Sequence, residues 1–91
     1  GGRLGMVVET VPADTLERLG INGGVLVRAV IPDSVAATAG VLPGDVITLL
    51  NSAEVQNARR FNHAVGKLEP KKDVALLVRR GEASRIIVIR R

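Results

Sequence analysis

The chain has 91 residues and a net charge of +4, from 13 Lys and Arg against 9 Asp and Glu, with 46% hydrophobic residues. A single Phe, with neither Trp nor Tyr, leaves almost nothing for bases to stack on, which argues against nucleic-acid binding. The apolar runs are shorter than the ~18 residues of a membrane span, and the lack of cysteine excludes disulfide and thiolate chemistry. This length makes one domain, residues 1–91.

Hydrophobic periodicity and turn residues divide the chain into short strands and helices. Strands are predicted at residues 6–11, 25–31, 46–50, 53–55, 74–79 and 85–90, and helices at residues 15–19, 35–39 and 58–68. Asp14, Ser34 and Asn57 are expected to cap these helices, because a short side-chain oxygen accepts from the free amides of a first turn. The expected class is mainly β with short helices (α+β), a curled antiparallel sheet of five or six strands capped by two or three helices.

Residues 31–50, IPDSVAATAGVLPGDVITLL, carry the most distinctive pattern in the chain. A short helix of small residues follows Ser34 and is expected to end at Gly40, which tolerates a positive φ. The Leu-Pro-Gly-Asp turn that follows should hold Gly44 at positive φ. The strand after this turn is predicted to be central, with Ile47 fully buried.

This stretch resembles the S-x-A-A-x-A-G-L-x-P-G-D-x-I segment of PDZ domains in bacterial envelope proteases. The resemblance extends to Arg3-Leu4-Gly5-Met6 at the start and to VALLVRRG near the end. It is strongest with the second, C-terminal PDZ domain of HtrA-type (DegP- or MucD-like) serine proteases. Site-2 and tail-specific proteases carry similar domains and stay open as alternative parents. The resemblance implies a PDZ-like partial barrel with the bacterial, permuted strand order.

The resemblance also implies a peptide-binding groove between the first strand and the longer helix. Arg3-Leu4-Gly5-Met6 aligns with the carboxylate-binding loop of the family. Successive backbone N–H groups in a loop before a strand can bind an anion, and Gly5 permits the required backbone turn. The guanidinium of Arg3 either favours a carboxylate or is simply solvated.

A bound peptide would pair with the first strand by β-augmentation. Side chains from this strand would line a pocket for the terminal residue and the helix would close it, although the same side chains could instead be core. Asn62 and Gly66 are candidates for the groove-facing edge of the helix. Gly66 costs about 1 kcal/mol relative to Ala inside a helix, which either a close ligand or tight helix packing would explain. The predicted peptide-binding residues are Arg3, Leu4, Gly5, Met6, Val7, Val8, Phe61, Asn62, Val65 and Gly66.

No catalytic set suggests itself in the sequence. His63 is the only histidine and is expected on the polar side of its helix, while the three serines fall in a cap, a turn and a hairpin. One histidine without cysteine also argues against a zinc site, and no cofactor is expected. The domain should therefore be catalytically inert, and the resemblance implies a trypsin-like endopeptidase domain that this sequence does not include.

Two functions stay open. The first is a module that binds hydrophobic C-termini of misfolded envelope proteins for a periplasmic protease in protein quality control. The second is a structural PDZ domain with little peptide binding, whose partners are its own protease domain and other PDZ domains in an oligomer. Both imply the periplasm by resemblance, without membrane insertion. No signal segment is present, and the opening Gly1-Gly2 is interpreted as a linker or a cloning scar.

Overall fold

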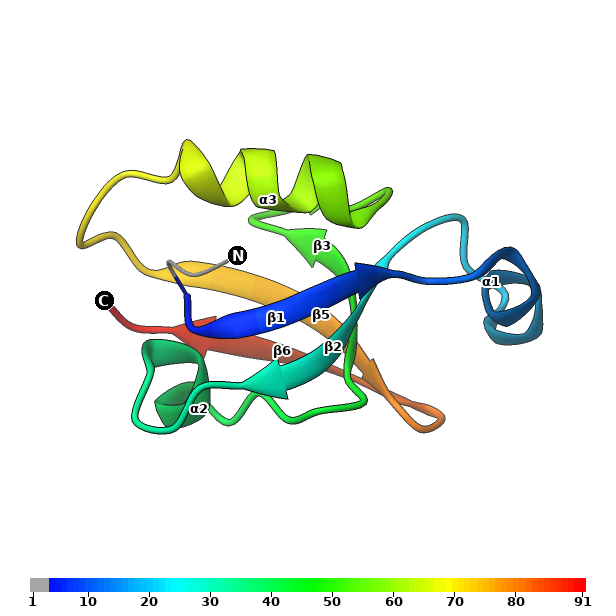
Figure 1. The fold of residues 1–91 in the computed structure, drawn as a ribbon, viewed down its shortest axis with the longest axis horizontal. Helices are drawn as coiled ribbons and strands as arrows, with labels where there is room; N and C mark the ends of the chain where they lie inside the picture. Colours follow the sequence, from blue (N-terminus) through cyan, green and yellow to red (C-terminus); the bar gives the residue numbers. More distant parts are fainter. Residues whose placement is uncertain (1–3) are drawn as a thin grey trace.

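The alternating apolar segments form one curled antiparallel sheet with three short helices around it, in a computed structural model that describes residues 4–91 (Figure 1). In chain order the elements are β1 (Met6–Thr10), α1 (Ala13–Leu19), β2 (Val25–Val30), α2 (Val35–Ala39), β3 (Val46–Leu50), β4 (Ala53–Glu54), α3 (Ala58–Gly66), β5 (Val74–Arg80) and β6 (Ala83–Ile89). The predicted fold class is confirmed, and each predicted strand and helix has a counterpart.

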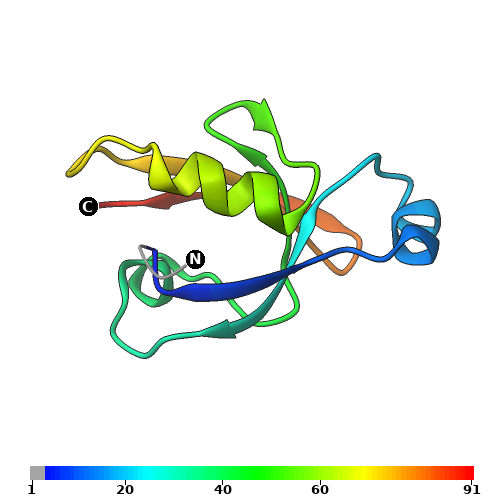
Figure 2. The same ribbon diagram turned by 45° about the horizontal axis from the view of Figure 1, so that its top comes forward.

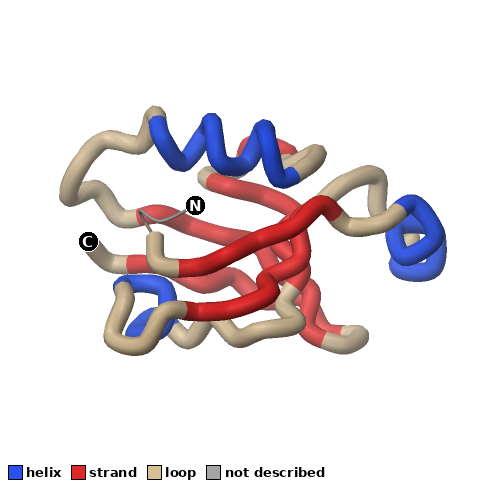
Figure 3. The backbone as a smooth tube through the Cα atoms, in the orientation of Figure 1, coloured by secondary structure: helices blue, strands red, loops and turns tan. Residues whose placement is uncertain are grey.

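The strands are hydrogen-bonded in the order β1-β2-β3-β5-β6, and β4 pairs with β3. This order places β1 and β6 at its two ends, and the two-residue β4 pairs with β3 alone. In Figure 2, α3 lies along one side of the curled sheet, α2 lies near its other side, and α1 projects beyond the end of the sheet. Figure 3 shows the same arrangement of helices around the strands, with α1 apart from the sheet. Among the described residues, no helix is long and apolar enough to cross a membrane.

The core lies inside the curl of the sheet and is almost entirely aliphatic. Alternation along β5 and β6 turns one face of each strand inward, and α3 adds Phe61 and Val65 to the same cluster. Ile47 is fully buried in β3, as expected from the sequence. Each such side chain contributes about 1.5–3 kcal/mol when it is removed from water. Burial of these alternating positions therefore fixes which face of each strand points inward.

Two of the three predicted helix caps are confirmed. Ser34 Oγ accepts from Ala37 N–H at 3.1 Å, and Asn57 Oδ1 accepts from Arg60 N–H at 2.9 Å. The prediction for Asp14 is wrong, because α1 begins one residue before it and Pro12 occupies the cap position. A proline with φ near −62° suits this entry, since it brings no N–H that would need a partner.

The turn between α2 and β3 is closed by a buried ion pair. Gly44 has φ 94°, as expected, and the following Asp45 side chain is 1% exposed. One carboxylate oxygen accepts from Leu42 N–H at 3.0 Å, and the two oxygens accept from Nε and Nη2 of Arg80 at 2.7 Å each. Nη2 of Arg80 also donates to Gly40 O at 2.9 Å. One arginine at the end of β5 therefore holds both ends of the turn.

This pair makes the stability of the fold depend on pH. Burial alone would raise the pKa of Asp45, but the hydrogen bonds from Arg80 and Leu42, with the positive charge of Arg80, outweigh it and hold this pKa below its ordinary value. A carboxyl whose pKa is lower in the folded chain contributes stability above its unfolded pKa of about 3.9. That contribution is lost as the pH falls through the lower folded pKa.

We expect Asp45→Asn to destabilise the domain at pH 7 by about 2–3 kcal/mol. This is less than the about 3–5 kcal/mol for breaking a fully buried pair, because the Arg80 side chain is 29% exposed. The difference between the two proteins should shrink as the pH falls below about 4, where the Asp45 carboxyl becomes protonated in the unfolded chain, and should be smallest below the lower pKa that this carboxyl has in the folded chain. Urea unfolding from pH 7 to pH 2 measures both effects. Arg28→Met, which removes an exposed pair with Glu9, is the control and should cost less than about 1 kcal/mol.

Candidate functional site

The first candidate surface is the free edge of β1, which runs beside α3 (Figures 1 and 2). β1 pairs with β2 on one side only, so its other edge is open to a further strand. The two elements are joined at one end, where Ala58 N–H at the start of α3 donates to Thr10 Oγ1 at 3.0 Å. An extended segment added to β1 would therefore lie between β1 and α3.

The loop before β1 is held in place by hydrogen bonds that its backbone carbonyl groups accept. Ala36 N–H donates to Leu4 O at 3.0 Å, and Ile31 N–H donates to Gly5 O at 2.7 Å. In a trans peptide unit the C=O and N–H bonds point in opposite directions. The N–H of Gly5 consequently points away from α2, and the N–H of Met6 points away from β2 towards the free edge. Two successive amide donors are fixed in direction at the start of the open strand.

Gly5 is required at its position for two reasons. Its φ is 88°, a conformation that residues with a Cβ rarely adopt. A Cβ built on Gly5 would also overlap the side chain of Ser34, whose Oγ lies 3.4 Å from Gly5 O. The loop at the start of the chain and the serine of the distinctive central stretch are therefore packed directly against each other.

The side chains predicted to line an apolar pocket belong to the core. Leu4, Met6, Phe61 and Val65 are each only 1–2% exposed and lie in one cluster, with Val8 partly buried against it. They fill the space inside β1 and α3, so a ligand side chain could enter only after these groups move. Their role as ligand contacts stays a prediction.

Asn62 and Gly66 lie on the edge of α3 that faces β1. Arg60, Ala64 and Leu68 line a cavity of about 190 Å³ on the side of β4, and residues four apart share a helix face. Asn62 and Gly66 follow the opposite edge, and both are exposed. Gly66 is the last residue of α3 rather than an interior one, and a Cβ there would meet no described atom within 4 Å. Tight helix packing is therefore not the reason for this glycine.

The remaining predicted site residues lie apart from this group. Val7 is exposed on the other face of β1 from Met6. Arg3 lies outside the residues that the structure describes. His63 is exposed on the surface of α3, and no cluster of three or more His, Cys, Asp or Glu among residues 4–91 could hold a metal ion.

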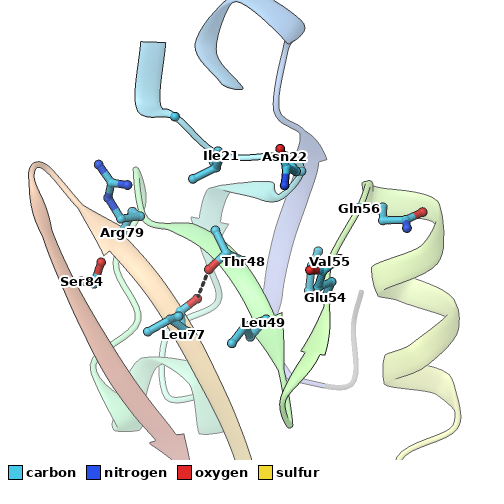
Figure 4. Close-up of a pocket in the computed structure, with 12 residues that line it drawn as sticks. Ile21, Asn22, Thr48, Leu49, Glu54, Val55, Gln56, Leu77, Arg79 and Ser84 are labelled. Atoms are coloured by element: carbon cyan, nitrogen blue, oxygen red, sulfur yellow. Dashed lines mark hydrogen bonds between the residues drawn. The ribbon is translucent and has the colours of Figure 1, made fainter. Parts of the chain in front are cut away.

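A further cavity, of about 510 Å³, lies on another part of the molecule and was not predicted from the sequence (Figure 4). The segment 20–23 and strands β3, β4 and β5 surround it, with Ile21, Leu49 and Leu77 among its lining residues. Thr48 Oγ1 donates to Leu77 O at 3.3 Å in its wall. Its lining residues are spread over most of the chain, so no local sequence pattern signals this cavity.

We expect Gly5→Ala to destabilise the domain by at least about 2 kcal/mol, from the strained φ together with the overlap with Ser34. Gly66→Ala is the matched control, because the same added methyl group meets open space at the end of a helix. That control should unfold at the same urea concentration or slightly higher, with a gain of up to about 1 kcal/mol. Equal effects of the two substitutions would contradict the packing described for Gly5.

Comparison with known proteins gives a consistent set of relatives. A family model described as "PDZ domain" matches residues 2–89. A probable periplasmic serine endoprotease, DegP-like, of Pseudomonas fulva is 38% identical over 83 residues, which are 90% of this chain and 17% of that protein. A protein of the same name from Chlamydia pneumoniae is 31% identical over 91 residues, covering 97% of this chain and 18% of that protein. The chain thus spans less than a fifth of the length of these curated relatives.

Solved structures give the same result. The HtrA-type protease AlgW with a decapeptide superposes with a TM-score of 0.81 at 29% identity, over 96% of this chain and 27% of that one. The HtrA3 PDZ domain bound to a phage-derived ligand, FGRWV, superposes with a TM-score of 0.80 at 24% identity, over 96% of this chain and 81% of that one. At 24% identity, the similarity to the HtrA3 PDZ domain concerns the fold alone.

Proposed function

The chain belongs to the PDZ domain family, as found in HtrA-type serine proteases, and we propose that it binds an extended peptide by its C-terminus along the free edge of β1. The observation that carries this proposal is the direction of the Gly5 and Met6 amides, which follows from the hydrogen bonds that hold the Leu4 and Gly5 carbonyls. A terminal carboxylate placed before these donors would accept from both.

The peptide would run antiparallel to β1 and end near Gly5. Main-chain hydrogen bonds to the open edge would supply affinity, and alternate side chains would supply specificity. Its last side chain would point towards Leu4, Met6, Phe61 and Val65, so an apolar terminal residue is favoured. Entry requires these buried groups to shift, which the unbranched and flexible side chain of Met6 makes easier.

The edge of α3 that carries Asn62 and Gly66 would flank the bound peptide. Gly66 offers no side chain, and the space beside its Cα is open within the described part of the chain. A ligand backbone could approach the helix closely at this position. The need for such an approach would explain a glycine that the packing of the fold does not require.

The parent protein is proposed to be a periplasmic serine endoprotease of which this chain is a non-catalytic module. The relatives carry that name, and the chain matches only a short part of them. We propose that the module is the second PDZ domain and that it binds apolar C-termini of misfolded envelope proteins. The similar protease AlgW has been solved with a decapeptide and with a tripeptide, which supports a peptide as the ligand.

The proposal predicts that a peptide ending in Val as the free acid binds at least about tenfold more tightly than its C-terminal amide. Hydrogen bonds to an ionised group contribute about 1.5–3 kcal/mol, against about 1 kcal/mol for neutral partners, and about 1.4 kcal/mol is tenfold. Isothermal titration of both peptides measures the ratio. Gly66→Glu should weaken binding of the acid severalfold, because it places bulk and negative charge at the groove edge.

His63→Glu is the control, since it adds the same charge on an exposed part of α3 away from β1. It should leave the affinity nearly unchanged. Equal binding of the acid and the amide would refute the carboxylate loop. No binding of any apolar C-terminus up to millimolar concentration would instead favour the assembly function.

A further inference from the structure

The second edge strand, β6, also presents unpaired backbone groups. A two-residue turn joins it to β5, with Arg80 opposite Ala83 and Gly81 at φ 61°. Arg80 and Ala83 therefore form a hydrogen-bonded pair, and bonded and non-bonded pairs alternate along the ladder from there. Ser84, Ile86 and Val88 are in non-bonded pairs, so their N–H and C=O groups point away from β5 to the open edge.

The side chains at the same three positions are exposed. Ile86 is 71% exposed, the most exposed large hydrophobic side chain of the described residues, and Val88 is 44% exposed. Helix α2 packs against β6, and its Ala36 belongs to the same buried cluster as Ile87 and Ile89. The side chains of Ile86 and Val88, on the other face of β6 from Ile87 and Ile89, stay exposed beside this helix. Unpaired backbone groups beside exposed apolar side chains are a template for another strand.

We propose that β6 pairs antiparallel with β6 of a second copy of this chain, about a twofold axis at Ile86. In this register Ile86 lies opposite Ile86 of the second copy, and Ser84 lies opposite its Val88. Each residue with outward-pointing groups then meets another such residue, so every pair can exchange two hydrogen bonds. The contact is the same patch on both copies, as a closed twofold dimer requires.

The charges at the ends of β6 favour this register. It places Glu82 opposite Arg90 of the second copy, and the symmetry repeats that pair at the other end. Arg85 faces Ile87 of the second copy rather than another cation. An axis at Arg85 would set two Arg85 side chains opposite each other, which is destabilising. An axis at Ile87 would shift the facing strand by two residues, so that Glu82 would no longer face Arg90 and both ion pairs would be lost.

This dimer uses the unpaired groups of a different strand from the proposed peptide site. β1 and β6 lie at opposite ends of the strand order. The two proposals rest on separate backbone groups, so a failure of one does not affect the other. Dimerisation through β6 would give the domain the assembly function that the sequence left open, through a surface separate from peptide binding.

Sedimentation equilibrium over micromolar to millimolar concentrations tests the proposal. The native chain should show a monomer–dimer equilibrium, and Ile86→Lys should weaken the dimer at least tenfold, because two cations would meet at the axis. Ile31→Lys, on another exposed hydrophobic residue, should leave the dimer unchanged. A native chain that stays monomeric throughout, or a dimer that persists in Ile86→Lys, would overturn the proposal. Thermal melts of both variants establish that they are folded.

Charge reversal tests the register. Glu82→Arg should weaken the dimer severalfold, and adding Arg90→Glu should restore it, because the two ion pairs form again with opposite polarity. A failure of the second change to restore the dimer would overturn the axis at Ile86.

Disulfide cross-linking tests the same contact independently and detects the dimer even when the two copies associate weakly. The chain has no cysteine, and Cα atoms of a bonded antiparallel pair lie about 5.5 Å apart, within the range of a disulfide. Oxidised Ile86→Cys should therefore form a covalent dimer, whereas Ile31→Cys should stay monomeric. Cross-linking to the same extent in both variants would contradict the proposed contact.

Discussion

The ion pair between Asp45 and Arg80 is the constraint on which the arrangement of the loop before β1 depends. Arg80 holds the turn before β3 at Asp45 and at Gly40, which is the residue that ends α2. Helix α2 is thereby placed with its first turn against the loop before β1, where it binds the Leu4 carbonyl. The directions of the two amides at the start of β1 thus depend on a charge pair at the far end of β5.

The curled sheet is open, and this leaves the strands at both ends of its order, β1 and β6, with unpaired edges. In β1 the free edge runs beside α3, so an added strand would be enclosed between a strand and a helix. In β6 the free edge borders an uncovered sheet face with exposed Ile86 and Val88. Both edges present unpaired backbone N–H and C=O groups. The edge of β1 is suited to a single extended peptide, and the edge of β6 is suited to the strand of another sheet.

Most of the fold followed from local signals in the sequence. Caps at Ser34 and Asn57, the positive φ of Gly44 and the burial of Ile47 each depend on neighbouring residues or on simple alternation. The ion pair of Asp45 was not predicted, because its partner lies 35 positions away and no spacing rule connects them. The proposed peptide-binding groove came from the family resemblance, whereas the burial of the side chains expected to line its pocket depends on packing between separate elements.

The side chains proposed to line the peptide pocket also belong to the core, which would limit how this domain can acquire new specificity. Leu4, Met6, Phe61 and Val65 are buried among one another, so a substitution that reshapes the terminal pocket also removes packing from the fold. Substitutions at Asn62 and Gly66 would not remove core packing, because both residues are exposed. Divergent members, and engineered variants, should therefore change ligand preference first at the helix edge and keep the pocket floor nearly constant.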